Sequence, residues 1–419
     1  MPAGMVVVGG GQAGARAAQA LRIEGWDGEI TLICAEESLP YERPPLSKDV
    51  LLGTKQPEAC LIHKPAFYEE NNIRVLLQTE ATRILRKEQQ LILSSGESIP
   101  YHRMLLATGS HPRTLSIPGA ETTTLITLRT MADAHRLSPL LAAEKRCVLI
   151  GGGLIGLEVA ATARQRGCEV TIIEAASRLL ERSVPADLAN TLKKRHEEEG
   201  VHFVLNASIR RLDRSGNETI ITLHDGAKFA CDLAIVGIGA VPNTDLAQRS
   251  DLTVEDGILV NSRLQTADPA IFAAGDACRF LHPILNRHIR LENWKNAEDQ
   301  AHIVASNMLG KDLAYSPNPW FWSQQYDLLL QVAGFPAIAS RIAVRTSRDD
   351  NFQIIFHLSD DGSIVGISSL GRGTSAAKDM RLGQILMEKQ AKPTVIELSE
   401  TRDLKILLPS SNSSRRINA

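Results

Sequence analysis

Two glycine-rich segments are the parts of this sequence best suited to chemistry: GGGQAG at residues 9–14 and GGGLIG at residues 151–156. Each follows an apolar run, at 5–8 and at 147–150, which predicts a strand, a tight turn and the start of a helix. In such a turn the first glycine permits the bend, the second lets the backbone approach a diphosphate, and the third lets the helix pack on the strand. The helix N-terminus attracts the diphosphate charge. Two copies in this context predict two dinucleotide sites, and a protein that holds two dinucleotides is expected to pass electrons between them.

A carboxylate follows each segment at a spacing that suits a ribose hydroxyl. Glu36 comes 22 residues after Gly14, and Glu174 comes 18 residues after Gly156. Each stands just beyond the second predicted strand of its unit, where a carboxylate accepts a hydrogen bond from the ribose. The first site is therefore predicted to use Gly9, Gly11, Gly14 and Glu36, and the second to use Gly151, Gly153, Gly156 and Glu174.

The second carboxylate also predicts which nicotinamide dinucleotide is used. Glu174 would accept from the 2′-hydroxyl of NAD and repel the 2′-phosphate of NADP, so NADH is expected over NADPH. Arg178 and Arg182 lie close by in the sequence and argue the other way. Glu158, two residues beyond the second glycine segment, has two interpretations, a favourable contact with the helix dipole or a contact near the nicotinamide.

The elements that must position these residues form two similar units. Strands at 5–8 and 29–33 with a helix at 12–24 make the first unit, which closes on a strand and glycine at 104–109. Strands at 146–150 and 169–173 with a helix at 154–166 make the second, which closes on 233–239. A rigid irregular loop is expected at 39–48, where three prolines fall within six residues.

Beyond residue 245 the pattern returns to the first unit, with a short strand at 266–276 that ends in Gly-Asp. Antiparallel strands at 341–346, 352–358 and 363–369 and a helix at 374–390 follow. The predicted fold class is α/β, with two Rossmann-like dinucleotide-binding domains and a C-terminal α+β domain. The predicted boundaries are 1–113 with 243–318 for the first domain, 114–242 for the second, 319–408 for the third and 409–419 for a disordered tail.

Composition narrows the function classes. The chain has 419 residues, 43% of them hydrophobic, and a formal net charge of −2, which gives no basic field for nucleic acid or an anionic membrane. The first strand begins at Met5, which leaves no room for a signal peptide, and no apolar run is long enough to span a bilayer. A cytoplasmic protein is expected. No catalytic triad or metal-ligand spacing is present.

Six cysteines, at 34, 60, 147, 168, 231 and 278, form no CxxC motif. They are expected to be reduced and structural, as small apolar side chains in or near strands. The proline-rich loop that follows the second strand contains no cysteine.

Longer motifs carry a resemblance to a known family. They are GGGQAG, LPYERPPLSK, LLATGS, GGGLIGLEVA, IFAAGDACR, RLENWKNAEDQA and PWFWSQQYD, spread between Met5 and Gln390. With them the chain resembles flavoproteins of the glutathione-reductase-like fold, and most of all the NADH:ferredoxin reductase components of bacterial aromatic-ring dioxygenases. This resemblance implies FAD in the first site, NADH in the second and a C-terminal region that caps the flavin. The thiol-based members of the fold need a redox cysteine near the flavin, so that branch is not expected here.

The resemblance also implies roles for individual residues. Lys48, Glu158 and Trp320 would lie at the reacting rings, with Lys48 near the flavin N5, whereas Trp322 is expected in the core. The residues implied around FAD, besides Gly9, Gly11, Gly14 and Glu36, are Arg43, Pro44, Lys48, Ala81, Thr108, Gly109, Arg129, Asp276 and Trp294. Those implied around NADH are Gly151, Gly153, Ile155, Gly156, Glu158, Glu174 and Gly239.

The implied reaction is hydride transfer from NADH to flavin, followed by single-electron transfer to a small acidic [2Fe–2S] ferredoxin that feeds an aromatic-ring dioxygenase. A basic patch of Arg279, Arg287, His288, Arg290 and Lys295 would dock that partner. Two alternatives stay open. One is a rubredoxin reductase or another NADH-dependent carrier reductase, and the other is a redox-sensing flavoprotein like apoptosis-inducing factor.

Overall fold

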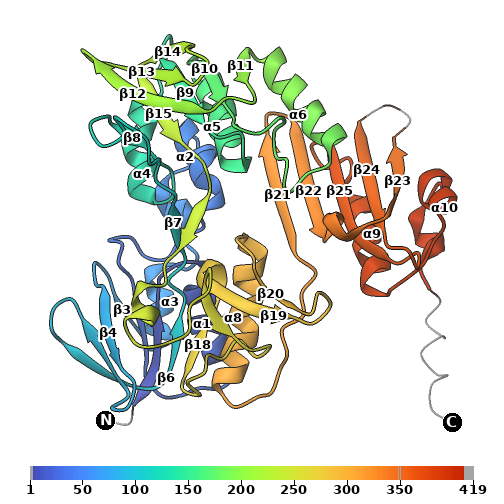
Figure 1. Ribbon diagram of the computed structural model, residues 1–419. Helices are drawn as coiled ribbons and strands as arrows, with labels where there is room; N and C mark the ends of the chain where they lie inside the picture. Colours follow the sequence, from blue (N-terminus) through green and yellow to red (C-terminus); the bar gives the residue numbers. More distant parts are fainter. Residues whose placement is uncertain (1–2, 348, 350, 410–419) are drawn as a thin grey trace. The chain divides into compact units, whose positions relative to one another are not determined.

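The computed structural model describes residues 3–347, 349 and 351–409 and divides them into two compact units. The first unit contains residues 1–114, 127–140 and 238–317, and the second contains 115–126, 141–237 and 318–419. The colours of Figure 1 follow the residue numbers, so the segments of each unit can be found by colour. The predicted tail at 409–419 lies, except for Pro409, outside the described residues.

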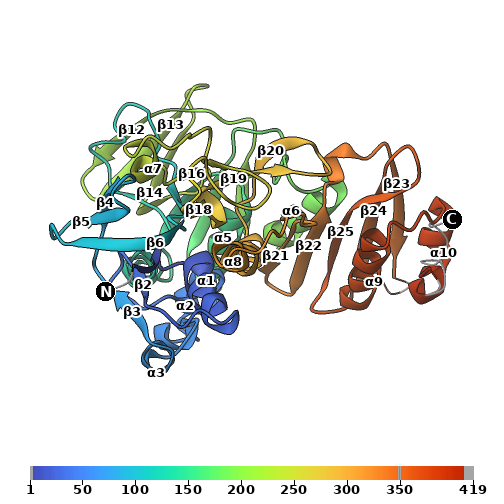
Figure 2. The ribbon, with the colours of Figure 1, turned by 90° about the horizontal axis from the view of Figure 1, so that it is seen from below.

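A parallel sheet forms the centre of the first unit. Its strands β1 (Gly4–Val8), β2 (Ile30–Ile33), β3 (Ile73–Leu76) and β6 (Ser98–Leu106) run in the order β3-β2-β1-β6, and β18 (Ile271–Ala273) pairs with β6. Helices α1 (Gln12–Ile23) and α8 (Trp294–Met308) pack against each other, as Figures 1 and 2 both show. Strands β1 and β2 are buried along their whole length, as expected where both faces of a parallel sheet are covered, whereas β3 and the first half of β6 also contain exposed residues.

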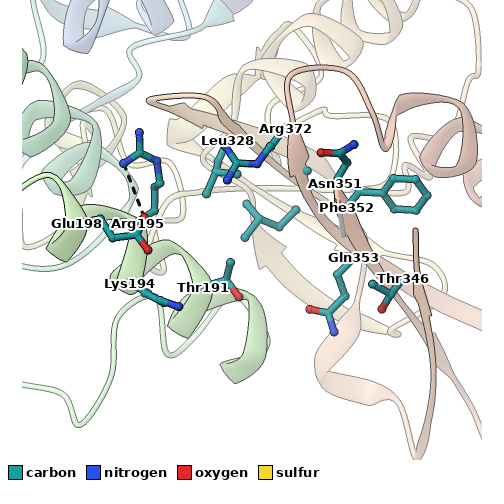
Figure 3. A pocket seen from close by; sticks show the side chains of 12 residues that line it. Thr191, Lys194, Arg195, Glu198, Leu328, Thr346, Asn351, Phe352, Gln353 and Arg372 are labelled. Atoms are coloured by element: carbon teal, nitrogen blue, oxygen red, sulfur yellow. Dashed lines mark ion pairs between the residues drawn. The ribbon is translucent and has the colours of Figure 1, made fainter. Parts of the chain in front are cut away.

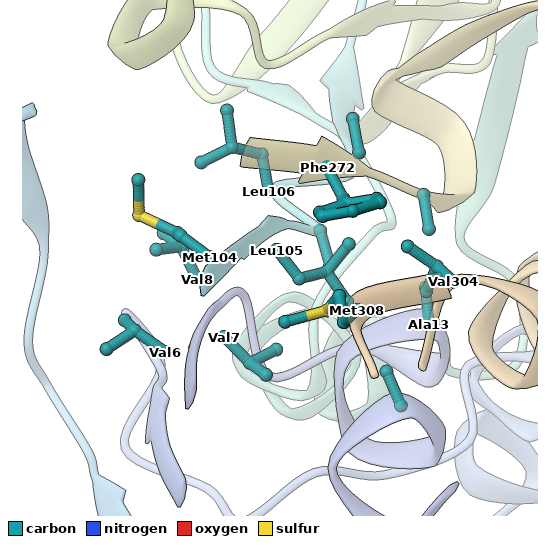
Figure 4. Close-up of a cluster of buried hydrophobic side chains, with 14 of the residues drawn as sticks. Val6, Val7, Val8, Ala13, Met104, Leu105, Leu106, Phe272, Val304 and Met308 are labelled. Carbon is teal, nitrogen blue, oxygen red and sulfur yellow. The ribbon is translucent and has the colours of Figure 1, made fainter. Parts of the chain in front are cut away.

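The core of this unit lies between the sheet and the two helices. Val7 and Leu105 of neighbouring strands, Phe272 of β18 and Met308 of α8 are fully or almost fully buried and lie in one cluster (Figure 4). Dispersion contacts at this packing density hold the end of β1 and the start of α1 in place, and with them the first glycine turn.

Smaller elements complete the first unit. Strands β4 (Ala81–Leu85) and β5 (Gln90–Leu93) extend the sheet from β6 as an antiparallel pair, which the sequence analysis did not predict. The remaining elements are α2 (Asp49–Leu52), α3 (Pro65–Glu70), β7 (Ser110–Pro112), α4 (Met131–Leu137), β16 (Ala240–Pro242), α7 (Asp245–Gln248), β17 (Ile258–Val260), β19 (Cys278–His282) and β20 (Arg287–Arg290). The proline-rich loop has a short 3₁₀ turn at Pro44–Ser47 and an isolated bridge from Tyr41 to Leu61, because its prolines disfavour longer regular structure.

The second unit begins with another parallel sheet. Strands β8 (Leu125–Ile126), β9 (Arg146–Ile150), β10 (Glu169–Ile173), β11 (Val201–Val204) and β15 (Leu233–Val236) run in the order β11-β10-β9-β15-β8. Helices α5 (Leu154–Gln165) and α6 (Ala186–Glu198) belong to this part. An antiparallel sheet that the sequence analysis did not predict follows, made of β12 (Ile209–Ser215), β13 (Glu218–Leu223) and β14 (Lys228–Cys231).

The C-terminal part of the second unit is an antiparallel sheet with helices beside it. Strands β21 (Trp320–Gln325), β22 (Leu328–Gly334), β23 (Arg341–Thr346), β24 (Phe352–Leu358) and β25 (Ile364–Arg372) run in the order β21-β22-β25-β24-β23. Helices α9 (Ala377–Glu388) and α10 (Val395–Glu400) pack on β25 and β23, as Figure 2 shows. The α/β fold class predicted from the sequence, with a C-terminal α+β part, is confirmed.

Two predicted elements differ from the structure. The strand expected at 266–276 is limited to Ile271–Ala273, because the chain turns into a short 3₁₀ segment at Gly275–Ala277. The helix expected at 374–390 begins only at Ala377, since β25 extends to Arg372 and a turn follows it. No helix in the part of the chain that the structure describes has the length and apolar character needed to cross a membrane.

Candidate functional site

In the first glycine turn, a side chain would clash with the backbone at two of the glycines, and the glycine between them has free space around it. Gly9 has φ 119°, and a Cβ there would lie 2.1 Å from the Ala107 carbonyl oxygen. A Cβ on Gly14 would lie 1.9 Å from the Gly9 carbonyl oxygen. A Cβ on Gly11 would meet nothing within 4 Å, so this position leaves space for a ligand. The fold therefore requires glycine at positions 9 and 14, whereas packing does not require it at position 11.

The start of α1 suits an anionic group. Gly11 is the N-cap, no side chain caps the helix, and its first turn has no acidic residue. The Nε2 and Oε1 atoms of Gln12 are buried and have no hydrogen-bond partner within the described structure. Open space, an uncompensated helix N-terminus and an unsatisfied amide fit the diphosphate of a dinucleotide such as FAD.

Beyond β2, two residues of the proline-rich loop fix Glu36. Its Oε1 accepts from Arg43 Nη2 at 2.7 Å, and its Oε2 accepts from the Tyr41 hydroxyl at 2.5 Å. The same hydroxyl accepts from the Met131 N–H at 2.8 Å. Each Glu36 oxygen still has a lone pair for a ribose hydroxyl. Tyr41 was missed at the sequence level, although its place two residues before Arg43 in the loop could have indicated it.

Asp276 forms the second half of the same network. Its Oδ2 accepts from Arg129 Nη2 at 2.8 Å and from the Ser110 hydroxyl at 2.9 Å. Arg43 Nη1 donates to the Arg129 carbonyl oxygen at 2.5 Å, which joins this group to Glu36. Four predicted residues, Glu36, Arg43, Arg129 and Asp276, therefore lie in one connected network. Ser110 is a further member; it ends the LLATGS motif but was not predicted as a site residue.

The other residues expected around FAD take varied positions in the first unit. Lys48 Nζ donates to the Pro44 carbonyl oxygen at 3.3 Å. Thr108 Oγ1 donates to the Asn243 carbonyl oxygen at 2.6 Å, next to Gly109 with φ 68°. Trp294 is half-buried at the first residue of α8, and Ala81 begins β4. Their contacts with FAD stay predictions.

The second glycine turn repeats the geometry of the first. Gly151 has φ 107°, and a Cβ on Gly156 would lie 2.3 Å from the Gly151 carbonyl oxygen. A Cβ on Gly153 would meet only the Gly237 carbonyl oxygen, at 3.9 Å. Helix α5 again has no side-chain cap and no acidic residue in its first turn. Ile155 is 49% exposed, and Gly239, with φ 107°, has open space around its missing Cβ. This turn also fits a dinucleotide diphosphate.

Glu174 supports this turn directly. Its Oε2 accepts from the Gly152 N–H at 2.6 Å, and its Oε1 accepts from the Ala176 N–H at 2.7 Å. Arg178, which could have favoured a 2′-phosphate, donates instead to the carbonyl oxygens of Leu179, Glu181 and Val184. Arg182 is exposed.

Comparison with known proteins gives the family. Residues 4–301 match the model of the pyridine nucleotide-disulphide oxidoreductases, and residues 320–408 match the reductase C-terminal model. The first match covers more than half of the chain. The chain belongs to the pyridine nucleotide-disulphide oxidoreductase family.

Named relatives of this oxidoreductase are similar over most of its length. It is 39% identical over 394 residues to the anthranilate 1,2-dioxygenase system ferredoxin–NAD(+) reductase component of Burkholderia cepacia, covering 93% of this chain and 97% of that one. It is 37% identical to putidaredoxin reductase of Pseudomonas putida, covering 88% of each chain. The ferredoxin reductase for the CYP199A2 system from Rhodopseudomonas palustris superposes with a TM-score of 0.92 at 33% identity, over 97% of this chain and 100% of that one.

These comparisons confirm several expectations. The chain is an oxidoreductase, and its cofactors are FAD and NADH, as expected from the sequence. The resemblance to ferredoxin reductase components is confirmed as well. A crystal structure of the covalent putidaredoxin reductase–putidaredoxin complex superposes on this oxidoreductase with a TM-score of 0.91 at 34% identity, over 97% of this chain and 98% of that one. The separate assignments of site residues stay predictions.

The six cysteines of this oxidoreductase are all buried. Each of the six cysteines is free. Burial, together with the charge of Glu36, raises the pKa of Cys34 to about 12. Burial also raises the pKa of Cys231 to about 12. A thiol needs a depressed pKa and access to its partner to act as a redox nucleophile, and these two groups have neither.

The expected basic docking patch is smaller than the sequence indicated. Arg290 is only 12% exposed along its side chain and pairs with Asp256 at 3.2 Å and with Glu292. Lys295 pairs with Asp299, one helical turn away. Arg279 Nη1 donates to the Glu255 carbonyl oxygen at 2.7 Å. Carboxylates therefore compensate Arg290 and Lys295, a backbone carbonyl holds Arg279, and Arg287 is the exposed member of the predicted patch.

The two tryptophans of β21 lie together on that strand. Their rings stack at a centroid distance of 5.1 Å and an angle of 19°. Trp320 is half-buried and packs against the C-terminal core, and its place beside the flavin stays a prediction. Trp322, expected in that core, is only half-buried. Side chains two residues apart lie on the same face of a strand, so the pair covers one patch.

A polar cavity of about 380 Å³ lies between α6 and strands of the C-terminal sheet (Figure 3). Lys194, Arg195 and Arg372 line it. Asp327 accepts from Arg195 Nε at 2.8 Å and also pairs with Arg372, so two of these cations are already compensated. None of the predicted site residues lines this cavity.

Proposed function

We propose that this oxidoreductase transfers hydride from NADH to FAD and electrons singly onward to a [2Fe–2S] ferredoxin. That ferredoxin would serve an aromatic-ring dioxygenase in the cytoplasm. The observation that carries the proposal is the pair of glycine turns, which leave free space for a ligand at Gly11 and at Gly153. The similar reductase components named for dioxygenase systems agree with the function expected from the sequence and confirm it at the level of a ferredoxin–NAD(+) reductase.

In this proposal the first unit holds FAD. Gly11 and the start of α1 would receive the diphosphate, and Glu36 would accept from a ribose hydroxyl. Asp276, fixed by Arg129 and Ser110, would accept from the ribityl chain. Lys48 would place a cation near the flavin N5 and stabilise negative charge there. When bound, FAD accepts a hydride and releases its electrons one at a time.

The second turn would hold NADH. Gly153 leaves room for the diphosphate, and Glu174, already held by two backbone N–H groups, keeps lone pairs for the ribose 2′-hydroxyl. Arg178 is occupied by backbone carbonyls, which supports the preference for NADH. Glu158, buried on α5, would contact the nicotinamide region.

The test is NADH-dependent cytochrome c reduction with and without an added [2Fe–2S] ferredoxin. We expect the rate to depend strongly on the ferredoxin. Equal or faster turnover with rubredoxin would favour the alternative carrier, and a reduced flavin that persists with negligible turnover would favour a redox sensor. Either result would overturn the proposed function.

A further inference from the structure

A chain of buried hydrogen bonds joins α5, β21 and α6 in the second unit. Ser323 Oγ donates to Glu158 Oε1 at 2.6 Å, and Gln325 Nε2 donates to Ser323 Oγ at 3.0 Å. His196 Nε2 lies 2.8 Å from Gln325 Oε1. These side chains are 4%, 1%, 1% and 0% exposed in the order Glu158, Ser323, Gln325 and His196. Burial of this many polar groups is unfavourable unless they bond to one another, so the chain has a defined geometry.

The direction of every bond in this chain follows from its atoms. An amide oxygen only accepts, so His196 must donate from Nε2 to Gln325. An amide nitrogen only donates, so Ser323 Oγ accepts from Gln325 and gives its single hydrogen to Glu158. All donors therefore point toward one carboxylate, and such aligned bonds strengthen one another.

His196, which ends this series of hydrogen bonds opposite Glu158, is held in one protonation state. Burial lowers the pKa of His196 to about 4, so the ring is neutral near neutral pH. Its Nδ1 is buried without a hydrogen-bond partner in the described residues, and a proton there would be an unsatisfied donor. The rings of Phe203 and Tyr326 make T-shaped contacts with the His196 ring, at centroid distances of 6.1 and 5.0 Å. The donor at Nε2 is thereby fixed in place.

Glu158 ends the same series of hydrogen bonds on the other side, and the proposed function places its carboxylate near the nicotinamide. Glu158 follows Gly156 by two residues on the helix whose start would hold the NADH diphosphate. The hydroxyl that bonds to it comes from β21, far along the sequence. We propose that Ser323 is a positioning residue, through which β21 orients the Glu158 carboxylate for hydride transfer. This inference rests on the proposed function.

Five variants test the inference. Ser323→Ala removes the hydroxyl, Ser323→Thr keeps it, and Glu158→Gln removes the charge, alone and combined with Ser323→Ala. Gln324→Ala, at the exposed neighbouring position of β21, is the matched control. The readouts are the anaerobic rate of flavin reduction by NADH, kcat and KM separately, NAD⁺ affinity by calorimetry, and the thermal unfolding temperature.

We expect Ser323→Ala to slow flavin reduction by about tenfold or more, as loss of a hydrogen bond to a charged group implies. The effect should fall on kcat, with NAD⁺ affinity unchanged within about twofold. Ser323→Thr should restore most of the rate, and Gln324→Ala should equal the wild type. In the Glu158→Gln background, Ser323→Ala should have no further effect, because the serine acts through the carboxylate.

Three results would overturn the inference: an unchanged rate in Ser323→Ala, independent effects of the two substitutions, or a Ser323→Thr variant as slow as Ser323→Ala. If Ser323→Ala does not fold, Gln325→Met removes the donor behind the serine, and an unchanged rate there overturns the inference equally. Failure of the wild-type flavin to be reduced by NADH would instead contradict the proposed function.

Discussion

The glycines of the two turns differ in what each one does, and substitutions can separate binding from folding. Gly11→Ala adds a Cβ in open space at an ordinary φ of −83°, so the fold should survive with a loss of roughly 0.5–1 kcal/mol at the N-cap. The methyl group would occupy the space proposed for the FAD diphosphate. We expect FAD to bind on the order of tenfold more weakly, measured by the flavin retained after gel filtration and by titration of the apoprotein.

Gly153→Ala is the matched control for this variant. Its φ is −81° and its Cβ would meet only one carbonyl oxygen, at 3.9 Å. This protein should keep FAD and lose affinity for NADH. If both variants lost the same dinucleotide, the assignment of the two turns would be wrong.

Glu174 combines a structural and a specificity role. Its two oxygens accept from backbone N–H groups, and its remaining lone pairs face the ribose in our proposal. Glu174→Gln replaces one acceptor oxygen by a donor, so kcat/KM for NADH should fall by about tenfold or more while that for NADPH falls less. Steady-state kinetics with both dinucleotides measure this. A larger kcat/KM for NADPH in the wild type would contradict the role of Glu174.

At the scale of elements, two buried histidines make the second unit sensitive to acid. Burial lowers the pKa of His196, on α6, and of His357, on β24, from 6.5 to about 4. At His196, Arg195 lowers the pKa further, and the bond to Gln325 and the charge of Glu199 oppose the shift. Between about pH 6.5 and 4 the unfolded chain binds protons that the folded chain does not, so stability falls as pH falls.

This linkage predicts a loss of about 2 kcal/mol per histidine in the free energy of unfolding between pH 7 and pH 5. Thermal unfolding of the holoenzyme across that range measures it. His357→Gln should give a shallower decline than the wild type, because one of the two groups is gone. A decline that is equally steep would show that other groups control the acid sensitivity.

The βαβ elements were predictable because apolar runs, glycines and spacing are local signals. Strands 146–150 and 169–173 and the starts of both helices match the structure for this reason. The hairpins around β4–β5 and β12–β14 were missed, since short amphipathic edge strands have weak periodicity. The hydrogen-bond chain through Ser323 was also missed, because it joins residues about 165 positions apart, which no local pattern reports.

On the scale of the whole molecule, family membership, two dinucleotide turns and six buried thiols lead to one account. In the function we propose, electrons would enter as a hydride at the second turn, pass to flavin at the first, and leave for a protein carrier. The alternative of thiol chemistry finds no support in Cys34, whose pKa is raised by burial. Ion pairing at Arg290 and Lys295 reduces the basic patch that was predicted from the sequence to dock the carrier.

The most direct test of this account is a single-turnover experiment without oxygen. The holoenzyme is reduced with NADH, freed of excess nucleotide and mixed with an oxidised [2Fe–2S] ferredoxin while flavin and ferredoxin absorbance are followed. Because a hydride carries two electrons and the ferredoxin accepts one, we predict that the flavin reoxidises as two ferredoxins are reduced. A flavin that stays reduced in the presence of the ferredoxin would contradict the account.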